Sequence, residues 1–589
     1  MREQLANPDA SQPPAPSSTG WRAVFPPWQW LSNYSWGYLP HDAVAGVTLA
    51  AYGIPVSLAY ASLAGLPPEY GIYCYLVGGL FYAVFGTSRQ LAIGPTSAIS
   101  MLVGVTVAGM AAGDPARWAS ICALTAVLIA VMCFLAWLLR LSSLVNFISE
   151  TILLGFKAGA ALTIALTQLP KLFGVKGGGE FFFERVEILA TQLPHTNITV
   201  LAFGAAVIVV LLLGERFLPG KPVALAVVMV SIVIASIASL EPLGFKVVGA
   251  IPQGLPAFRV PELRLRDVDG IVPLAFACLL LSYVESVSAA RALAQAHQYE
   301  IDARQELLAL GAANLAAGLF QAYPVAGGLS QSSVNDQAGA KTPLALVFAS
   351  IAVALCLIFL TGLLADLPTV VLAAIVLVAV KGLVNLTELR HVWRVSRFEF
   401  VVSMVAFAAV LLLGILKGVI IAVLVSMVLI IRRAAHPHVA VLGRIPGTRA
   451  FSDAERHPEN EPVPHTLVLR PEASLLYFNV DHVRARIREE CRKFAGPLSR
   501  VICDLSAAPA VDIAGARMLA ALADELHAAG VQLRLVGALG EARTLLRAEG
   551  LDHSVGEIDR QTSVADIVES DHGYETAQRE PALLRGDPV

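Results

Sequence analysis

Two polar, glycine-rich stretches interrupt a chain that is otherwise strongly apolar. The first covers residues 87–102 (TSRQLAIGPTSAISML), where Gly94 and Pro95 break an apolar run. The second covers residues 324–343 (PVAGGLSQSSVNDQAGAKTP). Lipid tolerates irregular backbone only where protein or a water-filled cavity covers it. We therefore interpret both stretches as broken helices that line a site, with ordinary surface or re-entrant loops as the alternative.

The two stretches occupy matching places in two halves of the chain. Gly94 and Gly327 are 233 residues apart, and Ala45 and Pro273, near the starts of two apolar segments, are 228 residues apart. Paired, shortened segments interrupted by glycine or proline at matching places are the pattern of an inverted-repeat transporter. The spacing therefore predicts two related halves with one broken helix in each.

The residues at the two breaks suit the binding of a small anion. A half-helix beginning at Pro95 and Thr96, and another beginning near Gly328 and Leu329, would aim their first amides at a shared midpoint. Each helix N-terminus acts roughly as +0.5 elementary charge and presents unpaired N–H groups, so two of them form an anion site without lysine or arginine. Side-chain donors at the same places are Thr96, Ser97, Ser330, Gln331 and Ser332.

Glu285 lies well inside the apolar run at residues 274–295. A charged residue at mid-bilayer costs about 2.5–3.5 kcal/mol and is by default a candidate functional residue. An ionised carboxylate would repel an anion, whereas a protonated one would not, and desolvation favours the neutral form of a carboxyl group. We therefore hypothesise that Glu285 takes up a proton together with the anion. A Na⁺ ligand beside Ser282 and Ser288 is the competing role.

Plainer interpretations of the charged residues stay open. Glu285 could pair with Arg291, or could lie near the membrane interface if its span begins later. Lys157 is expected to extend its ammonium group toward the cytosolic interface. The residues interpreted as interfacial are Asp42, Asp336, Lys341, Asp366 and Lys417.

The composition predicts that a polytopic helical membrane domain positions these residues. Of the 589 residues, 56% are hydrophobic and 15% are charged, against about 25% charged in average soluble domains. Apolar runs near the length of about 20 residues needed for one crossing recur along residues 36–435. About fourteen spans fit this length, although twelve or thirteen are also compatible. The seven cysteines are scattered, so we expect no metal site, disulfide framework or cofactor.

Basic residues indicate the orientation of the spans. If the N-terminus is cytoplasmic, many basic loops fall on one side, as the positive-inside rule requires. This places both termini in the cytosol and the spans in the cytoplasmic (inner) membrane. The residues on which this rests are Arg89, Arg140, Arg216 with Lys221, Arg304, Arg390, Arg394, Arg397, Arg432 and Arg433.

A polar linker at residues 436–464 separates the membrane domain from a small domain at residues 465–570. Strands are predicted at 465–470, 474–480, 501–506 and 531–537, with helices at 481–494 and 514–528. Strands that alternate with helices at this spacing indicate a small α/β domain. The N-terminal residues 1–35 and the tail at residues 571–589 are predicted to be flexible.

Three segments resemble a known family. Residues 45–100 (AGVTLAAYGIPVSLAYASLAGLPPEYGIYCYLVGGLFYAVFGTSRQLAIGPTSAIS) resemble the N-terminal signature of the SulP anion permeases, the sulfate-permease group of solute carriers. Residues 323–345 resemble the tenth-span motif of that family, and residues 501–519 (VICDLSAAPAVDIAGARML) are similar to its STAS domain. The resemblance implies a seven-plus-seven inverted repeat with a gate domain and a core domain that moves like an elevator, in a homodimer. Family substrates include sulfate, bicarbonate, chloride, oxalate and dicarboxylates.

The resemblance also implies which residues form the substrate site. An acidic residue at the position of Glu285 is associated with cation coupling in the family, in agreement with the electrostatic hypothesis. The implied site residues are Ser57 and Tyr60 from the first span; Gly94, Pro95, Thr96 and Ser97 from the third; Glu285 from the eighth; and Gly328, Leu329, Ser330 and Gln331 from the tenth.

The chain departs from the family pattern at three places. Val56 follows Pro55 where members usually carry glutamine or glutamate, so one polar contact is missing. Gln331 stands where many members have arginine after the tenth-span serine, which weakens the pull on a divalent anion and favours a monovalent substrate such as bicarbonate. In the STAS region, residues 512–515 (DIAG) lack the hydroxyl that related regulatory domains phosphorylate, so a phosphorylation switch at that position is excluded.

Together these features predict secondary active transport of a small inorganic anion of the sulfate or bicarbonate class, by an elevator mechanism and coupled to protons through Glu285. The alternatives are a membrane-anchored STAS regulator or sensor, and a Na⁺-coupled bicarbonate or dicarboxylate transporter. A nucleobase permease shares the inverted-repeat plan, but the STAS region and first-span motif disfavour it. Because the sequence contains no Ser/His/Asp set, metal-ligand spacing or phosphate-binding loop, we expect no enzymatic activity, and we expect no nucleic-acid partner.

Overall fold

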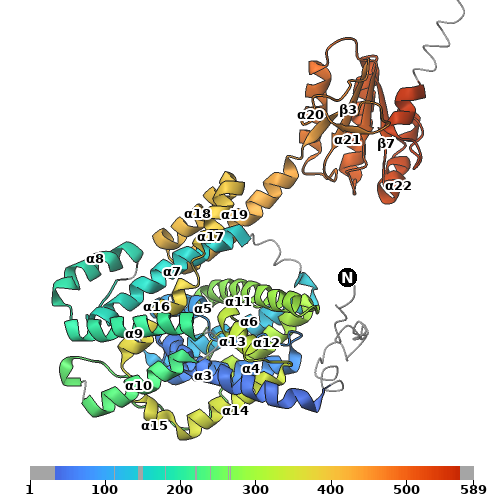
Figure 1. Cartoon of the computed structure of the whole chain (residues 1–589). Helices are drawn as coiled ribbons and strands as arrows, with labels where there is room; N and C mark the ends of the chain where they lie inside the picture. The colour runs from blue at the N-terminus through green and yellow to red at the C-terminus, as the bar shows by residue number, and fades with distance from the viewer. Residues whose placement is uncertain are drawn as a thin grey trace, which may run out of the picture. The chain divides into compact units, whose positions relative to one another are not determined.

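The computed structural model describes residues 34–111, 113–142, 150–179, 181–218, 222–238, 241–262, 264 and 267–570. The chain divides into two compact units, Met1–Ser426 and Met427–Val589 (Figure 1). Residues 1–33 of the predicted flexible N-terminal segment lie outside the described residues. So do the tail at 571–589 and Lys221 of the basic-loop prediction.

The first unit is built from helices that recur in the same order in both halves of the membrane domain. The first half contributes α3 (Leu39–Leu63), α4 (Pro68–Phe85), α5 (Ser97–Ala111), α6 (Pro115–Leu138), α7 (Glu150–Phe173), α9 (Ile198–Phe217) and α10 (Val223–Ala238). The second half contributes α11 (Val268–Ala296), α12 (Ala303–Leu319), α13 (Leu329–Gln337), α14 (Leu344–Phe359), α16 (Thr369–Lys381), α18 (Arg397–Leu413) and α19 (Ile415–Ala435). The two series correspond to the predicted seven-plus-seven repeat of a helical membrane protein.

The third helix of each half is short. Among the described residues, seven helices are long and apolar enough to cross a membrane, and α5 is one of three shorter apolar helices. The helix α5 has 15 residues and α13 has 9, whereas a complete crossing needs about 20. Each is preceded by a two-residue strand, β1 (Ile93–Gly94) before α5 and β2 (Ala326–Gly327) before α13. The predicted breaks are therefore two half-helices, each entered through a short strand.

Helix contacts divide the first unit into two packed groups. The helices α3, α4, α6, α12 and α14 pack on one another, and α11 packs on α6. A second group is formed around α7, which packs on α16, α18 and α9. Close approach explains one of these contacts, because a Cβ atom added at Gly155 of α7 would lie 1.9 Å from the carbonyl oxygen of Ser403 in α18. Larger side chains at that position would force the two helices apart.

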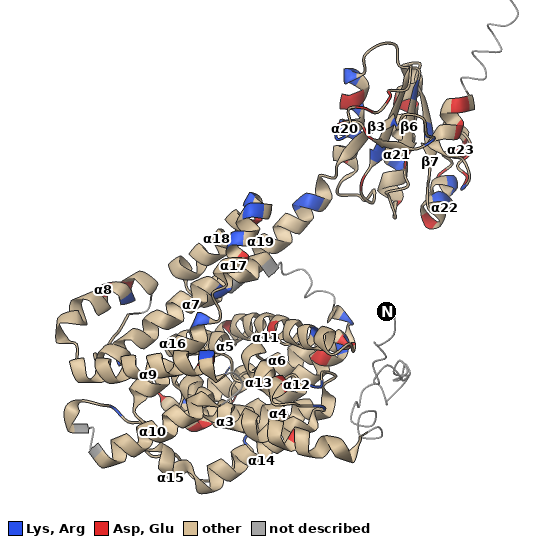
Figure 2. Ribbon diagram, in the orientation of Figure 1, with Lys and Arg blue, Asp and Glu red and all other residues tan. Residues whose placement is uncertain are grey.

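The second unit is an α/β domain with a five-stranded sheet of order β4-β3-β5-β6-β7. The strands are β3 (Val439–Arg444), β4 (Phe451–Asp453), β5 (Thr466–Pro471), β6 (Arg500–Asp504) and β7 (Gln532–Val536), and β5, β6 and β7 are parallel. The helices are α20 (Val480–Lys493), α21 (Ile513–Ala528), α22 (Gly540–Ala548) and α23 (Asp552–Val555). Figure 2 shows charged residues spread over this unit and sparse along the helices of the first. That distribution matches a membrane domain followed by a water-exposed domain.

Two predictions about this unit need correction. Residues 474–480, predicted as a strand, form a turn that leads into α20, with a single bridge between Leu475 and Val511. The turn is fixed by polar side chains, since Asn479 accepts a hydrogen bond from the Leu476 amide at 3.0 Å and Asp512 accepts one from the Tyr477 amide at 2.7 Å. The segment 436–464, predicted as a linker, contains β3 and β4, so the sheet begins earlier than expected.

Candidate functional site

The two half-helices meet at a short antiparallel crossing of β1 and β2. Ile93 pairs with Gly327, and Gly94 pairs with Ala326. Because the strands run in opposite directions, α5 and α13 leave the crossing in opposite directions and their N-terminal turns flank it. The N-termini of both helices thus lie at one short crossing, and the partial positive charge of a helix N-terminus favours an anion.

Polar side chains from α13 hold the crossing together. The Gln331 amide donates hydrogen bonds to the carbonyl oxygens of Ala92, at 3.0 Å, and Ala326, at 3.2 Å, and its oxygen accepts one from the Tyr75 hydroxyl. The Ser332 hydroxyl accepts a hydrogen bond from the Ala92 amide at 2.9 Å. Both side chains were expected to offer donors to a ligand. The structure instead uses them to fix β1 against β2 and the start of α13.

Thr96 directly precedes α5, and its side chain lies at the start of that helix. Its side chain is 8% exposed, and its Oγ1 atom has no hydrogen-bond partner of normal geometry within the described residues. Buried polar atoms are almost always hydrogen-bonded, so an unpaired one at a helix N-terminus indicates a place for a ligand. Ser97 is also buried and interacts with the Tyr60 hydroxyl of α3. Thr96 is therefore a buried predicted donor that a ligand could engage.

The remaining predicted site residues differ in their access to this region. Ser57 is fully buried and donates to the carbonyl oxygen of Ile54 at 2.8 Å, within its own helix. In the first turn of α13, Leu329 and Ser330 are exposed. Pro95 is buried and Gly328 is the N-cap residue of α13.

Gly94 is required by close packing at the crossing. A Cβ atom at this position would lie 2.9 Å from the Tyr75 ring, which is shorter than any comfortable contact between carbon atoms. The same ring binds the Gln331 amide through its hydroxyl, so its position is fixed from two sides. The glycine thus lets β1 lie directly against α4.

Glu285 of α11 lies beside the entrance to α5. The carboxyl group is half-buried and interacts with the Thr96 hydroxyl and with the ammonium group of Lys157 in α7. Arg291, the alternative partner, is exposed. Lys157, which was expected to extend toward the cytosolic interface, is half-buried, and its positive charge acts on Glu285. The carboxyl group of Glu285 and the ammonium group of Lys157 thus come from different helix groups.

The serines considered as partners of Glu285 in a Na⁺ site are arranged differently from one another. Ser282 is buried and donates to the carbonyl oxygen of Cys278 in its own helix. Ser288 is exposed. The nearby Ser286 links α11 to the crossing, because its hydroxyl accepts a hydrogen bond from the Gly327 amide at 2.8 Å. Of the three serines, the one in direct contact with the crossing is the one that the sequence interpretation omitted.

Asp42, interpreted from the sequence as interfacial, is in fact fully buried. Its carboxylate accepts hydrogen bonds from the Lys341 amide at 2.7 Å, the Thr342 amide at 3.0 Å and the Thr342 hydroxyl at 2.6 Å. The Tyr34 hydroxyl is a fourth donor, at 3.3 Å. Asp42 thus anchors the loop that follows α13 to the start of α3.

Glu306 of α12, which the sequence analysis did not identify, holds the segment before β1 in the same way. It accepts hydrogen bonds from the Thr87 amide at 2.8 Å, the Thr87 hydroxyl at 2.6 Å, the Ser88 amide at 3.3 Å and the Tyr82 hydroxyl at 2.9 Å. Each carboxylate therefore receives two consecutive amides, a threonine hydroxyl and a tyrosine hydroxyl. The sequence signal was an acidic residue in the first turn of a helix. Such residues are common at exposed helix ends, so this pattern did not predict that Glu306 is buried.

Comparison with known families places the chain among membrane transporters. The model of the sulfate permease family matches residues 39–406, and the STAS domain model matches residues 457–566. A probable sulfate transporter of Mycobacterium tuberculosis (strain CDC 1551 / Oshkosh) is 33% identical over 544 residues, which cover 92% of this chain and 97% of the relative. The chloroplastic sulfate transporter 4.1 of Arabidopsis thaliana is 30% identical over 590 residues, covering 94% and 86% of the two chains.

Solved structures with the same fold include two anion transporters. The murine Solute Carrier 26 family member A9 anion transporter, in its inward-facing state, matches with a TM-score of 0.84 and 24% identity, over 96% of this chain and 97% of that one. The transmembrane domain of a cyanobacterium bicarbonate transporter, BicA, matches with a TM-score of 0.58 and 20% identity, over 67% of this chain and 98% of that one. At these identities the likeness concerns the fold alone.

Proposed function

The chain belongs to the sulfate permease family and carries a C-terminal STAS domain, and from this premise we propose how this anion transporter works. It moves a small inorganic anion of the sulfate or bicarbonate class across the cytoplasmic membrane by secondary active transport. The observation that supports the proposal is the crossing of β1 and β2, from which α5 and α13 begin, together with a buried Thr96 hydroxyl that lacks a hydrogen bond of normal geometry within the described residues. Sulfate is the first anion to test, because the similar curated relatives are named sulfate transporters.

The packing of the helices supports an elevator mechanism. The helices that flank the crossing, and α11 with Glu285, pack with α3, α6 and α12. By contrast, α7 packs with α16 and α18. The first group corresponds to the core domain and the second to the gate domain that the sequence predicts. Movement of the core along the gate would expose the same anion site to each side of the membrane in turn.

The position of Glu285 supports coupling to protons. Its carboxyl group interacts with Thr96, so a bound anion at Thr96 would lie close to it. Protonation of this carboxyl would remove the repulsion between two negative charges, and anion binding would therefore favour proton binding. The coupling predicts anion/H⁺ symport.

Uptake into proteoliposomes tests the transport function and its coupling together. Purified protein should take up radiolabelled sulfate or bicarbonate, and an inward-acid pH gradient should stimulate that uptake. The variant Glu285→Gln should retain uptake but lose the stimulation, while Glu300→Gln, an exposed acidic residue, should behave as wild type. Uptake that is insensitive to the gradient in wild type but lost when Na⁺ is replaced by choline would favour Na⁺ coupling instead.

The alternative function, a membrane-anchored STAS regulator, makes a different prediction. A regulator or sensor would not catalyse anion uptake in any reconstituted form. If cells expressing the chain truncated after Ala434 take up labelled anion at a rate similar to cells expressing the full chain, the helical unit is itself a transporter.

We also propose that both termini are cytosolic and that the protein is a homodimer.

A further inference from the structure

The orientation of α7 is fixed by its contact with α18. Cβ atoms added at Gly155 and Gly159 would lie 1.9 Å from the Ser403 carbonyl oxygen and 3.0 Å from the Phe407 carbonyl oxygen, so this glycine face lies on the α18 backbone. Lys157 is two residues from each glycine, which corresponds to a rotation of about 200° around the helix. Lys157 therefore projects from the side of α7 that faces away from α18.

The face of α7 that carries Lys157 is turned toward the core domain. Ala161 and Ile164, one and two turns further along this face, are 1% and 0% exposed. Lys171 lies on the same face at the other end of α7, and its Nζ atom donates to the Ser62 hydroxyl of α3 at 2.9 Å. A lysine thus stands near each end of the face that α7 presents to the core.

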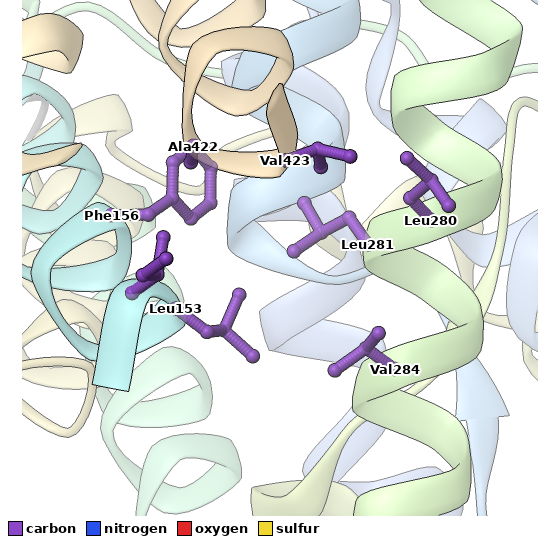
Figure 3. A pocket seen from close by; sticks show the side chains of 8 residues that line it. Leu153, Phe156, Leu280, Leu281, Val284, Ala422 and Val423 are labelled. Atoms are coloured by element: carbon purple, nitrogen blue, oxygen red, sulfur yellow. The ribbon is translucent and has the colours of Figure 1, made fainter. Parts of the chain in front are cut away.

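A small apolar cavity lies between α7 and α11, the helices that carry Lys157 and Glu285. Figure 3 shows Leu153 of α7 on one side and Leu281 and Val284 of α11 on the other. Lys157 follows Leu153 by four residues and Glu285 follows Leu281 by four, so each charged residue lies one turn from a residue that lines the cavity. The lining consists of Ile152, Leu153, Phe156, Leu280, Leu281, Val284, Ala422 and Val423.

The surroundings strengthen the electrostatic effect of Lys157. The cavity has a volume of about 20 Å³ and a wholly apolar lining, and apolar cavities stay dry because a buried water needs polar partners. Charges interact more strongly in such a region than in water. Within the described residues Lys157 has no contact ion pair, so its ammonium group is not neutralised by direct contact with a carboxylate.

We propose that Lys157 is a fixed cation of the anion site and that it strengthens the binding of divalent anions more than that of monovalent anions. The inference rests on the proposed anion transport. Gln331, at the position where many family members carry arginine, is bound to the crossing, and Lys157 supplies the missing positive charge from α7. The titratable groups that interact electrostatically with Glu285 are Lys157 and Tyr60. When Glu285 is ionised it offsets the Lys157 charge, and when it is protonated that charge acts on the anion alone.

The dependence on anion charge gives a specific test. The interaction energy with a fixed cation doubles from a monovalent to a divalent anion, so the change in affinity for sulfate is the square of the change for bicarbonate. In proteoliposomes at one fixed pH, Lys157→Gln should raise the KM for sulfate about tenfold and the KM, or inhibition constant, for bicarbonate about threefold. Lys157→Arg should restore both constants. Lys417→Gln, which removes an exposed lysine of α19, is the matched control and should change neither.

A second readout separates this inference from the proposed function. Binding of sulfate and bicarbonate to purified wild type and variants, measured by the ligand-induced rise in melting temperature, does not require transport. If wild type transports anions but Lys157→Gln shifts both constants equally, or shifts neither, Lys157 is not the site cation. If wild type neither transports nor binds either anion, the proposed function fails and this inference fails with it. A folded Lys157→Arg variant that behaves like Lys157→Gln would also overturn it.

Discussion

The buried carboxylates of the helical unit are held in two contrasting ways. Asp42 and Glu306 each receive two backbone amides, a threonine hydroxyl and a tyrosine hydroxyl. Glu285 has no such set of donors: the Thr96 hydroxyl lies next to it, and the Lys157 ammonium group of another helix acts on it through its charge. A carboxylate with a complete set of donors anchors the chain, because losing its charge would leave several buried donors unpaired. A carboxyl group with few donors can exchange a proton at a smaller cost.

This contrast assigns separate tasks to neighbouring parts of the core. Glu306 fixes the segment before β1, and Asp42 fixes the loop after α13, so the two half-helices are held at their outer connections. Gln331 and Ser332 fix them at the crossing itself. Thr96 and Glu285 lie between these fixed points, and we propose that a ligand and a proton bind there without breaking these contacts.

The largest effect is expected for Glu306→Gln. An amide cannot accept from all four donors, and its own N–H group would face some of them, so the unfolding free energy should fall by about 3 kcal/mol. Denaturant unfolding in detergent micelles measures this change, with Glu300→Gln as the exposed control. Equal stability of the two variants would show that the donors around Glu306 do not depend on its charge.

A smaller loss is expected for Gly94→Ala. The added methyl group would lie 2.9 Å from the Tyr75 ring, and such overpacking typically costs about 1–3 kcal/mol. The Tyr75 hydroxyl is also hydrogen-bonded to Gln331. Displacing the Tyr75 ring should therefore reduce anion uptake as well as stability. Gly109→Ala, in the α5 helix that follows β1, is the control, since nothing lies within 4 Å of a Cβ atom there. If the two variants transport equally well, the geometry of the crossing tolerates more change than this account allows.

Thr96→Val should separate binding from stability. The substitution keeps the shape of the side chain and removes a hydroxyl that has no protein partner of normal geometry, so the unfolding free energy should stay the same or rise slightly. Anion affinity should fall by about 1 kcal/mol, or about fivefold, through the loss of one hydrogen bond. Sulfate-dependent thermal stabilisation and uptake measure the two quantities separately. A loss of stability without a loss of affinity would assign Thr96 a structural role.

The smallest effect concerns an exposed carboxylate of the STAS domain and extends the comparison to the second unit. Hydrogen bonds from the amide and hydroxyl of Ser563, together with Arg449, lower the pKa of Asp566 from 3.8 to about 2. Because the folded-state pKa is depressed, this interaction stabilises the domain above pH 3.8, and the contribution is lost as the pH falls toward about 2. In the full chain, Asp566→Asn should slightly speed hydrogen exchange near residues 563–569 at neutral pH.

The pH dependence provides the check on that variant. The difference from wild type should shrink as the pH falls below 3.8, whereas Asp524→Asn, at an exposed position of α21, should show no difference at any pH. A difference that persists in acid would mean that Asp566 contributes through packing rather than through its charge.

The sequence predicted the features that depend on local pattern. Apolar runs predicted the spans. The Gly-Pro pair at 94–95 and the Gly-Gly pair at 327–328 predicted the two half-helices. Alternating strands and helices predicted most of the STAS domain. The strand predicted at 474–480 was wrong because Asn479 and Asp512 fix a turn there, and β3 and β4 were missed because they lie in a stretch rich in turn residues.

The features that could not be predicted depend on contacts between distant residues. Asp42 meets Thr342 across 300 positions, and Glu306 meets Thr87 across 219. Such contacts decide whether an acidic residue near a helix end is exposed or buried. The residues next to it in the sequence do not distinguish the two outcomes. The orientation of Lys157 likewise follows from the packing of Gly155 and Gly159 on α18.

Locating a bound anion directly is the decisive measurement. Selenate is a divalent tetrahedral analogue of sulfate, and its selenium atom identifies it by anomalous scattering in crystals of the full chain. The account predicts one selenium peak in the core, in contact with the Thr96 hydroxyl and flanked by the first turns of α5 and α13. A selenium peak elsewhere in a protein that transports selenate, with Thr96 still unpaired, would contradict it.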